Sequence, residues 1–468
     1  MSFGQKTSAI VPNVLPFALF LILKILFPVM NFGKKNNRKS IQKNTKEQIQ
    51  KTFIKKTGKE KSLKLKYKII IFLSSFLICV SLLIGAASAG TGTDIREEIS
   101  QFPGFSGILI KDLNTQEVLF SHNEDKLFTP ASLTKIFTLL AALEIFDEEN
   151  YAYPTSFYFS STTPGEINGD LYIIGSGDPT QSPDIIRKIA DALVQKFNIN
   201  HISGDIVLDN SKFLPEEFLG RGWMWDDKNP LIGALTVMGY KAKEKQNSYL
   251  NAIPLLWGNI FSQELSKKGV KIEGNIRIRK VQEDLRIKYI YYSDTLDKIL
   301  AYMMKKSDNQ SAENIFRTLA PEDNPEGGFN TIARAIASLE EVIDTTLGLK
   351  WGKDYILVDG CGLSEYNLTT PAHLVNAMTY LYRKYDFKIL DYFANTKEGG
   401  TLKERLPFQV WGKTGTLSSA SALAGILETK NKRWVVFCLM ENNFIFIEED
   451  DDPKIFENKI IEYIYENF

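Results

Sequence analysis

The sequence predicts a chain of the α/β (α+β) class, in which helices and strands at both ends flank an inserted, mainly β region. An apolar helix pattern occupies residues 129–146. Short strand-like runs with Gly-rich and Pro-rich turns fill residues 153–292, and helical periodicity returns after residue 294. Segregated helices and strands of this kind are typical of α+β domains. We therefore divide the chain into residues 1–89, 90–155, 156–292 and 293–468, the second and fourth forming one domain around the third.

The charge of the 468-residue chain is divided between a basic N-terminal segment and an acidic body. The net charge is zero, yet residues 1–68 contain 16 Lys and Arg against 2 Glu. The rest carries an equal acidic excess, which argues against a nucleic-acid partner. The sequence has no HExxH, CxxC or GxSxG pattern, so zinc-hydrolase and α/β-hydrolase chemistry have no support. No metal or other cofactor is implied, and the sequence leaves open whether Cys361 and Cys438 pair.

The N-terminal segment has the features of an export signal. An apolar run at residues 69–84 follows the basic residues and precedes Ala87-Ser-Ala89, a small-residue cleavage pattern. We predict an exported protein, periplasmic or on the extracytoplasmic face of the inner membrane, with cleavage after Ala89. The alternative is an uncleaved membrane anchor, because the apolar run nearly reaches spanning length.

The helix pattern at residues 129–146 opens with polar residues that an apolar helix does not otherwise need. Thr129 is a suitable N-cap, Pro130 suits the first helical position, and apolar residues continue through Phe146. Ser132 and Lys135 lie three residues apart and so share one face. Burial lowers the pKa of a lysine, so a neutral Lys135 can take the proton of Ser132 and make it a nucleophile. The alternative is a capped core helix whose Ser and Lys face solvent.

The remaining elements follow from the same kind of pattern. Residues 107–113 and 117–121 are expected to form a hairpin, and the inserted region is expected to contain one helix, at 182–197. Further helices are expected at residues 295–306, from there to 319, at 329–347, and after Asp452 to Phe468, with closing strands at 411–417, 422–427 and 434–440.

Three short polar motifs form a candidate catalytic group: Ser132-Leu-Thr-Lys135 (SxxK), Ser307-Asp-Asn309 (SxN) and Lys413-Thr-Gly415 (KTG). Each pattern is weak alone, because the chain contains a second copy of every one. Two of those copies lie in the basic tail, which has no core to hold a site, and the third precedes the SxxK helix. Together the three motifs supply a nucleophile, a proton acceptor and a fixed cation.

With these motifs the chain resembles the serine penicillin-binding proteins of peptidase family S13, the D-alanyl-D-alanine carboxypeptidase/endopeptidases of low molecular mass, class C. Four further runs are similar to segments of that family: Asp359-Gly-Cys-Gly-Leu-Ser364, Gly399-Gly-Thr-Leu-Lys-Glu-Arg405, Gly175-Ser-Gly-Asp-Pro-Thr180 and Gly222-Trp-Met-Trp-Asp-Asp227. The resemblance covers roughly residues 105–440. It implies a β-lactamase/transpeptidase-like domain, with an antiparallel sheet between helices and an inserted β-rich subdomain.

The resemblance also implies a role for each motif residue. Ser132 would be the acyl-forming nucleophile and Lys135 its general base. Ser307 would relay a proton to the leaving amine, Asn309 would bind the substrate amide, and Lys413 would bind the terminal carboxylate. Residues implied to line the substrate site are Thr414, Gly415, Thr416, Asp209 and Arg405, with the backbone N–H groups of Ser132 and Thr416 as the oxyanion hole.

Several of these residues have a second interpretation. Asp209 either contacts a substrate side-chain amine or forms a turn after a strand. Arg405 either approaches the site or caps a helix. Cys361 stands where the family usually has Ser, and we interpret it as a small buried residue that fills the same space. The tryptophans at positions 223, 225 and 257 are interpreted as core of the inserted region.

The predicted function is that of an exported serine D-Ala-D-Ala carboxypeptidase, and a D,D-endopeptidase where it cuts crosslinks. Its partners would be peptidoglycan stem peptides, β-lactam antibiotics as covalent inhibitors, and a membrane through the N-terminal segment. One alternative is a β-lactamase, although the 175-residue separation of Ser132 and Ser307 counts against it. Another is a catalytically silent penicillin-sensing or wall-binding protein, whose unused buried Lys and Ser would cost stability.

Overall fold

The computed structural model describes residues 95–160, 163–213, 220–224, 229–240, 249–281, 287–320, 331–444 and 452–468. All of these belong to one compact unit, Gly92–Phe468. The predicted basic segment, export signal and cleavage site at residues 1–89 lie outside the described residues, as does Trp225. Within the described ranges, no helix combines the length and the apolar character that crossing a membrane requires.

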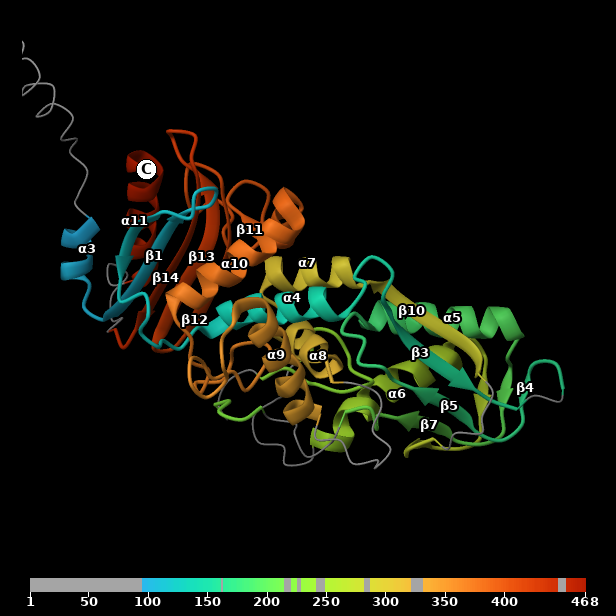
Figure 1. The fold of residues 1–468 in the computed structure, drawn as a ribbon. Coiled ribbons are helices and arrows are strands. Elements are labelled where there is room, and N and C mark those ends of the chain that lie inside the picture. Colours follow the sequence, from blue (N-terminus) through green and yellow to red (C-terminus); the bar gives the residue numbers. More distant parts are fainter. Residues whose placement is uncertain are drawn as a thin grey trace, which may run out of the picture. The chain divides into compact units, whose positions relative to one another are not determined.

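A six-stranded antiparallel sheet holds both ends of this unit together (Figure 1). Its strands, in spatial order, are β11 (Ala394–Asn395), β12 (Val410–Leu417), β13 (Ala420–Glu428), β14 (Trp434–Asn442), β1 (Phe105–Asp112) and β2 (Val118–His122). The predicted hairpin and the three predicted closing strands are therefore confirmed. β1 lies next to β14 although more than 300 residues separate them, so the sheet joins the segments before and after the inserted region.

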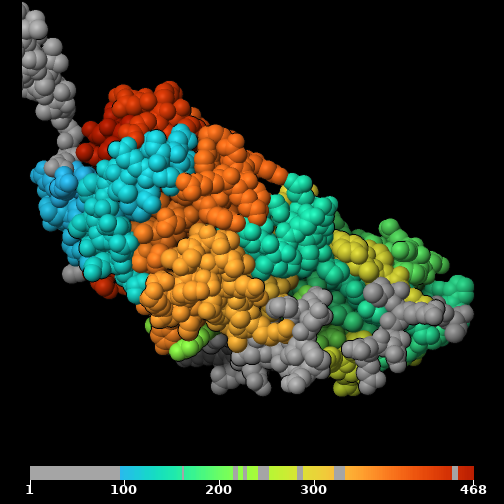
Figure 2. Space-filling model, in the orientation of Figure 1, coloured from blue at the N-terminus to red at the C-terminus, as the bar shows by residue number. Residues whose placement is uncertain are grey.

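The two faces of this sheet are covered by different helices, because successive side chains of a strand point to opposite sides. Ile108 and Ile110 of β1 pack in one cluster with Ile460 and Ile464 of α11 (Pro453–Asn467). Leu109, between them, packs in a second cluster with the helices of the other face. The helix α3 (Ile95–Gln101) packs beside α11, and Figure 2 shows both chain ends of the unit at one end of the molecule. The predicted antiparallel sheet between helices is thus confirmed.

The second cluster is built around α4 (Thr134–Ile145), of whose 12 residues 10 are buried. It also includes residues of α7 (Leu296–Lys306), α8 (Asn309–Thr318), α9 (Thr331–Leu347) and α10 (Pro371–Tyr385). A 3₁₀ segment, η3 (Asp386–Tyr392), follows α10. The three helices expected between residues 295 and 347 match α7, α8 and α9. The helix α10 was not predicted.

The start of the helix expected at residue 129 is a correction. The chain passes through a 3₁₀ turn, η1 (Ala131–Leu133), and α4 begins only at Thr134. Thr129 does not cap the helix, since the N-cap position of α4 is Leu133; the Thr129 N–H donates to Asn442 Oδ1 over 2.8 Å. Ala131 has a φ of +48°, which breaks regular helix geometry one residue before Ser132.

A second sheet of five strands has the order β10 (Ile287–Thr295), β3 (Ala152–Tyr158), β5 (Leu171–Ile174), β7 (Ile206–Asp209), β9 (Ile276–Ile278). The first three strands are antiparallel and the last three parallel. Short parallel strands β4 (Glu166–Ile167), β6 (His201–Ile202) and β8 (Lys271–Ile272) form a third sheet. Parallel strands require crossover connections, and helices supply them here.

The helices of this part are α5 (Pro183–Phe197), capped by Ser182 where the sequence predicted a helix, and α6 (Tyr249–Lys267). Both contribute to one hydrophobic cluster with the five-stranded sheet. The expectation of a single helix in residues 153–292 was wrong. α6 contains Pro254 and Gly258, the two residue types of lowest helix propensity, so the local sequence gives a weak helix signal. The division of the chain at residues 155 and 292 stays an interpretation.

Candidate active site

Ser132 and Lys135 meet at the transition from η1 to α4. Ser132 is half-buried in the 3₁₀ turn, and Lys135, one turn later, is fully buried. The Lys135 amine donates to Ser132 Oγ over 2.9 Å. The predicted pair is therefore in contact, and the alternative in which both side chains face solvent is wrong.

Two further acceptors fix the amine of Lys135 on its other sides. They are Asn309 Oδ1 at 2.7 Å and the backbone carbonyl oxygen of Cys361 at 2.5 Å. Burial lowers the pKa of Lys135 below its ordinary value. The carboxylates of Asp359, Asp308 and Glu313 act in the opposite direction. The result is an amine that loses its proton more readily than a lysine in water and is aimed at Ser132.

The SxN segment is the junction between α7 and α8. Ser307 ends α7 in a left-handed conformation with a φ of +55°. Asp308 is the N-cap of α8, and its carboxylate accepts the N–H of Ser311 over 2.7 Å. Asn309 is the first residue of α8. The sharp turn lets Ser307 and Asn309 both reach the group around Lys135, while Asp308 serves the backbone.

Lys413 brings β12 into the same group. It is fully buried, and its amine donates to Ser307 Oγ over 2.7 Å and to the carbonyl oxygen of Thr414 over 2.6 Å. Burial lowers the pKa of Lys413 well below its ordinary value, and the positive charge of Lys135 lowers it further. The five motif residues thus form two hydrogen-bonded sets, Ser132–Lys135–Asn309 and Ser307–Lys413. The two sets adjoin because Ser307 and Asn309 lie on the same turn.

The strand β12 runs beside η1 (Ala131–Leu133), which carries the predicted nucleophile Ser132 and is called the nucleophile turn, and β12 presents an edge there. β11 pairs with β12 only at Trp411 and Gly412, so in the described part of the sheet the residues from Lys413 onward have a strand neighbour on one side only. An added Cβ on Gly415 would lie 2.8 Å from the carbonyl oxygen of Pro130 and 3.2 Å from the amide nitrogen of Ser132. The KTG glycine is therefore required by close backbone approach. Thr416 is exposed on this edge, and Thr414 donates to Thr401 Oγ1 over 2.9 Å.

The loop Asp359–Ser364 also packs against the site. An added Cβ on Gly362 would lie 1.9 Å from the carbonyl oxygen of Ala131, so this loop packs directly on the nucleophile turn. Cys361 presents its carbonyl oxygen, not its thiol, to Lys135. Burial raises the pKa of the Cys361 thiol well above its ordinary value, so the thiol stays neutral. This explains why Cys can stand here in place of Ser, and Cys361 and Cys438 are both buried free thiols.

The sequence analysis missed the centre of this loop, the Asp359 carboxylate. It is fully buried and accepts hydrogen bonds from the N–H groups of Gly362 and Ser364, each over 2.8 Å. The Asn367 side chain donates to it over 2.7 Å and the Trp223 indole N–H over 2.8 Å. An Asp that opens a Gly-rich turn was the available signal, since Asp accepts from nearby backbone N–H groups.

Two predicted substrate residues are not brought to this group. The Asp209 carboxylate accepts the N–H groups of Ser211, over 2.8 Å, and Val281, over 2.7 Å, as a turn-forming Asp would. Arg405 donates to Asn458 Oδ1 over 2.7 Å and forms an ion pair with Glu457, both on α11. Arg405 therefore binds the last helix of the chain on the outer face of the sheet.

Trp223 also differs from its prediction. It packs in the cluster of α4, not in that of the inserted region, whereas Trp257 lies in the latter as predicted. Among the described residues, no group of three or more His, Cys, Asp or Glu side chains could hold a metal ion.

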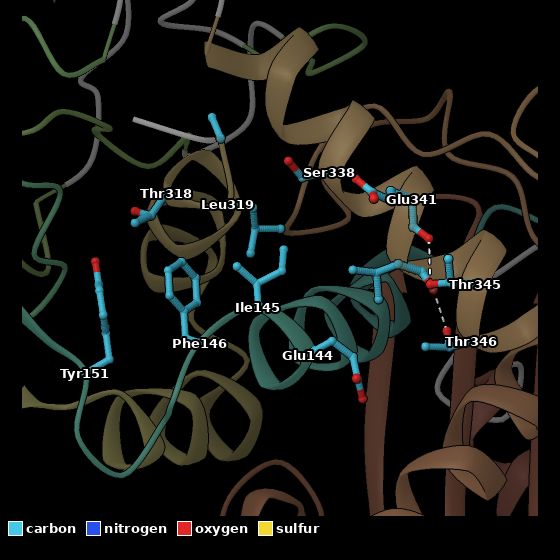
Figure 3. A pocket seen from close by; sticks show the side chains of 12 residues that line it. Glu144, Ile145, Phe146, Tyr151, Thr318, Leu319, Ser338, Glu341, Thr345 and Thr346 are labelled. Carbon is cyan, nitrogen blue, oxygen red and sulfur yellow. Dashed lines mark hydrogen bonds between the residues drawn. The ribbon is translucent and has the colours of Figure 1, made fainter. Parts of the chain in front are cut away.

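A cavity of about 600 Å³ lies at the other end of α4 (Figure 3). Its lining includes Glu144 and Phe146 at the end of α4, Thr318 and Leu319 at the end of α8, and Glu341 on α9. None of the motif residues line it. The motif residues and this cavity are therefore separate features, since Ser132 and Lys135 lie at the start of α4 and the cavity lies at its end.

The comparisons with known proteins agree with this geometry. The family model of the D-Ala-D-Ala carboxypeptidase 3 (S13) family matches residues 93–242 and 236–464. The chain belongs to this family. The family is named for D-Ala-D-Ala carboxypeptidase activity, in agreement with the predicted function, and the resemblance seen in the motifs is confirmed.

Similar proteins include the D-alanyl-D-alanine carboxypeptidase DacB of Haemophilus influenzae. It is 23% identical over 455 residues, which cover 80% of this chain and 92% of the relative. The D-alanyl-D-alanine carboxypeptidase of Actinomadura sp. (strain R39) is 25% identical over 452 residues, covering 75% and 81%.

The fold is shared with a solved structure, that of penicillin binding protein 4 (dacB) from Haemophilus influenzae. The TM-score is 0.68 at 20% identity, and the match covers 80% of this chain and 100% of the solved one. The β-lactamase/transpeptidase-like fold predicted from the motifs is thereby confirmed.

Proposed function

We propose that this protein is a serine D-Ala-D-Ala carboxypeptidase that acts on peptidoglycan stem peptides through an acyl-enzyme on Ser132. The observation that carries the proposal is the contact of one buried amine, Lys135, with Ser132 Oγ and Asn309 Oδ1. The substrate is an amide next to a terminal carboxylate. Its cleavage requires a nucleophile, a proton carrier, an oxyanion site and a fixed cation, and the group contains one candidate for each.

Acylation follows from the contacts of Lys135. Its neutral amine takes the proton of Ser132 as Oγ bonds to the carbonyl carbon of the penultimate D-Ala. The backbone N–H groups of Ser132 and Thr416 would hold the oxyanion, and losing one such donor costs about 10²–10³ in kcat. Because Asn309 gives its oxygen to Lys135, its amide N–H₂ is left to bind the substrate carbonyl.

Departure of the terminal D-Ala needs a proton on its nitrogen. Ser307 lies on the same turn as Asn309, the partner of Lys135, and its Oγ contacts Lys413. We assign Ser307 the relay that passes the proton taken up by Lys135 to the leaving nitrogen, so that Lys135 is neutral again and Lys413 keeps its own proton. The same Lys413 would attract the terminal carboxylate of the substrate. The open edge of β12 can pair with an extended peptide, which aligns the scissile amide with Ser132. Water then releases the stem peptide from Ser132. A D,D-crosslink has the same bond, so endopeptidase action is part of the proposal.

We also propose that the body acts outside the cytoplasm, where peptidoglycan lies, and that residues 1–89 deliver it there as a cleaved signal or as a membrane anchor. The apolar run behind a basic segment supports this. Fractionation of cells that produce the full chain with a C-terminal tag would test it. Tagged protein confined to the cytoplasm would contradict the proposal.

The decisive experiment is intact-mass spectrometry of residues 90–468 with and without a penicillin, together with the Ser132→Ala variant. We expect an adduct of one penicillin on the wild type and none on the variant. Release of free D-Ala from a pentapeptide then separates a carboxypeptidase from a penicillin sensor, and sustained hydrolysis of the penicillin would indicate a β-lactamase. A folded wild-type protein without any adduct would refute the assignment of Ser132.

A further inference from the structure

Trp223 links a segment from the middle of the chain to the loop that holds Lys135. Its indole is buried among the residues that surround α4, and its N–H donates to Asp359 Oδ2 over 2.8 Å. Two more bonds join the same two segments. Ser364 Oγ donates to the carbonyl oxygen of Arg221 over 2.7 Å, and the N–H of Glu365 donates to the carbonyl oxygen of Gly222 over 3.3 Å. Residues 220–224 are therefore docked on the loop at three points.

The loop transmits this docking to both reacting side chains. The carboxylate of Asp359 folds the turn by accepting the N–H of Gly362, which packs on the Ala131–Ser132 peptide. Between them, Cys361 gives its carbonyl oxygen to the Lys135 amine. The preceding residue is also fixed, because the Gly360 carbonyl accepts Thr138 Oγ1 over 2.7 Å. A shift of Asp359 would consequently move an acceptor of Lys135 and the wall of the nucleophile turn together.

We propose that Trp223 is a positioning residue for Lys135 and Ser132, acting through Asp359 and the Cys361 carbonyl. This rests on the proposed function, because it concerns the same nucleophile and base. A buried carboxylate needs its donors, and removing one of the stronger ones costs far more than an exposed hydrogen bond. Asp359 accepts from five donors, the fifth being the Cys361 thiol over 3.7 Å, and the indole N–H is the only one of the five that comes from outside residues 359–367.

The test is the variant Trp223→Phe, which keeps an aromatic ring and deletes the N–H. Trp257 provides a matched control, because its buried indole N–H also donates to a side-chain oxygen, that of Gln181, but within the other hydrophobic cluster. We expect the rate of penicillin acylation to fall about tenfold in Trp223→Phe and to stay at the wild-type value in Trp257→Phe. Ser364→Ala, which breaks the bond to Arg221, should give a smaller fall and serves as a second variant if the first is poorly folded.

The pH profile separates positioning from a general loss of stability. Lys135 is faced by Asp359, Asp308 and Glu313, by the neutral Cys361 thiol and by the Lys413 amine. Losing a donor leaves the charge of Asp359 less compensated, and a looser loop hydrates the amine, so both effects favour protonated Lys135. The low-pH limb of the acylation rate should therefore move to higher pH in Trp223→Phe and Ser364→Ala only.

Three results would count against these ideas, each in its own way. An unchanged rate and profile in Trp223→Phe would overturn the inference while leaving the proposed function intact. Equal losses in Trp223→Phe and Trp257→Phe, without a shifted limb, would show a general effect of destabilisation and would also overturn it. A wild type that penicillin does not acylate would refute the proposed function, and the inference with it.

Discussion

A single methyl group on Gly362 would test the architecture of the site. Gly362 has a φ of +82°, and an added Cβ would lie 1.9 Å from the carbonyl oxygen of Ala131 and 3.0 Å from the amide nitrogen of Ser132. Since Cβ atoms stay at least 3.0 Å from other heavy atoms, the loop and the nucleophile turn must separate by about 1 Å in Gly362→Ala. Both are backbone segments, so no side chain can move aside to relieve the clash.

The magnitude follows from two contributions. A non-Gly residue in the left-handed region costs about 1–2 kcal/mol, and forced overpacking of a buried site costs about 1–3 kcal/mol, so about 2–5 kcal/mol of unfolding free energy should be lost. Gly352→Ala is the matched control, because Gly352 has a φ of +75° and no atom within 4 Å of the added Cβ. It should lose only the backbone part, about 1–2 kcal/mol.

Urea unfolding measures both variants, and the acylation rate with a fluorescent penicillin measures the site. A displacement of about 1 Å can cost about 100-fold in rate, so Gly362→Ala should acylate about 100-fold more slowly, whereas Gly352→Ala should match the wild type. Equal stability losses in the two variants would refute the clash. A folded Gly362→Ala protein with wild-type acylation would refute the claim that this loop sets the nucleophile turn.

Three other substitutions test separate parts of the reasoning. Cys361→Ser should leave acylation within about twofold and stability within about 1 kcal/mol, because only the backbone carbonyl of this residue contacts Lys135; a tenfold loss of rate would contradict that. Arg405→Met leaves the buried Glu457 carboxylate without its cation and should cost about 3 kcal/mol of unfolding free energy with little effect on acylation, whereas loss of acylation in a stable variant would favour a role at the site. Burial depresses the pKa of Lys413, so between its folded-state and unfolded-state pKa values the folded protein binds fewer protons than the unfolded one, and the free energy of unfolding should rise with pH toward about 10.4. In Lys413→Met this rise should be smaller. Urea unfolding from pH 7 to 10 measures it, and the same pH dependence in the variant and the wild type would contradict the burial argument.

The sequence predicted those elements whose signals are local. The hairpin of β1 and β2, the helices α5, α7 and α8, and the closing strands follow from alternation, helical periodicity and capping residues that need no knowledge of distant contacts. The family motifs then indicated which residues gather, because the order of three weak patterns is more specific than each pattern.

The Thr-Pro pair shows where local signals fail. Thr370-Pro371 begins α10 as a Thr-Pro pair should, with the Thr370 hydroxyl accepting the N–H of His373. The same pair at Thr129-Pro130 does not cap α4, whose N-cap position is Leu133; here Asn442 of β14 binds both the N–H and the carbonyl oxygen of Thr129. Asn442 is 313 positions away in sequence. Contacts of such separation decide the geometry of the nucleophile turn, and no window of the sequence contains them.

The contacts that hold Asp359 and Arg405 were equally hidden from the sequence analysis. The position of Asp359 is set by two N–H groups of its own loop and by an indole 136 residues earlier in the chain. Arg405 binds Asn458 and Glu457 of α11, more than 50 residues later in the chain. A positively charged residue in a family-like run is therefore a weak predictor of a substrate contact, because a buried carboxylate elsewhere in the fold, here Glu457, can bind it instead.

The two buried amines suggest how the substrate itself completes the site. Burial lowers the pKa of both Lys135 and Lys413, and the positive charge of Lys135 lowers the pKa of Lys413 further. Protonation of one amine therefore disfavours protonation of the other. We infer that a carboxylate arriving at Lys413 favours the charged form there and, by the same repulsion, the neutral form of Lys135, which is the form that Ser132 requires. A peptide that ends in an amide instead of a carboxylate should therefore lose acylation rate at saturation and not only affinity, because it forfeits an interaction that acts on the reacting group. Single-turnover kinetics with the two peptides measure this, and a difference confined to KM would mean that Lys413 only binds.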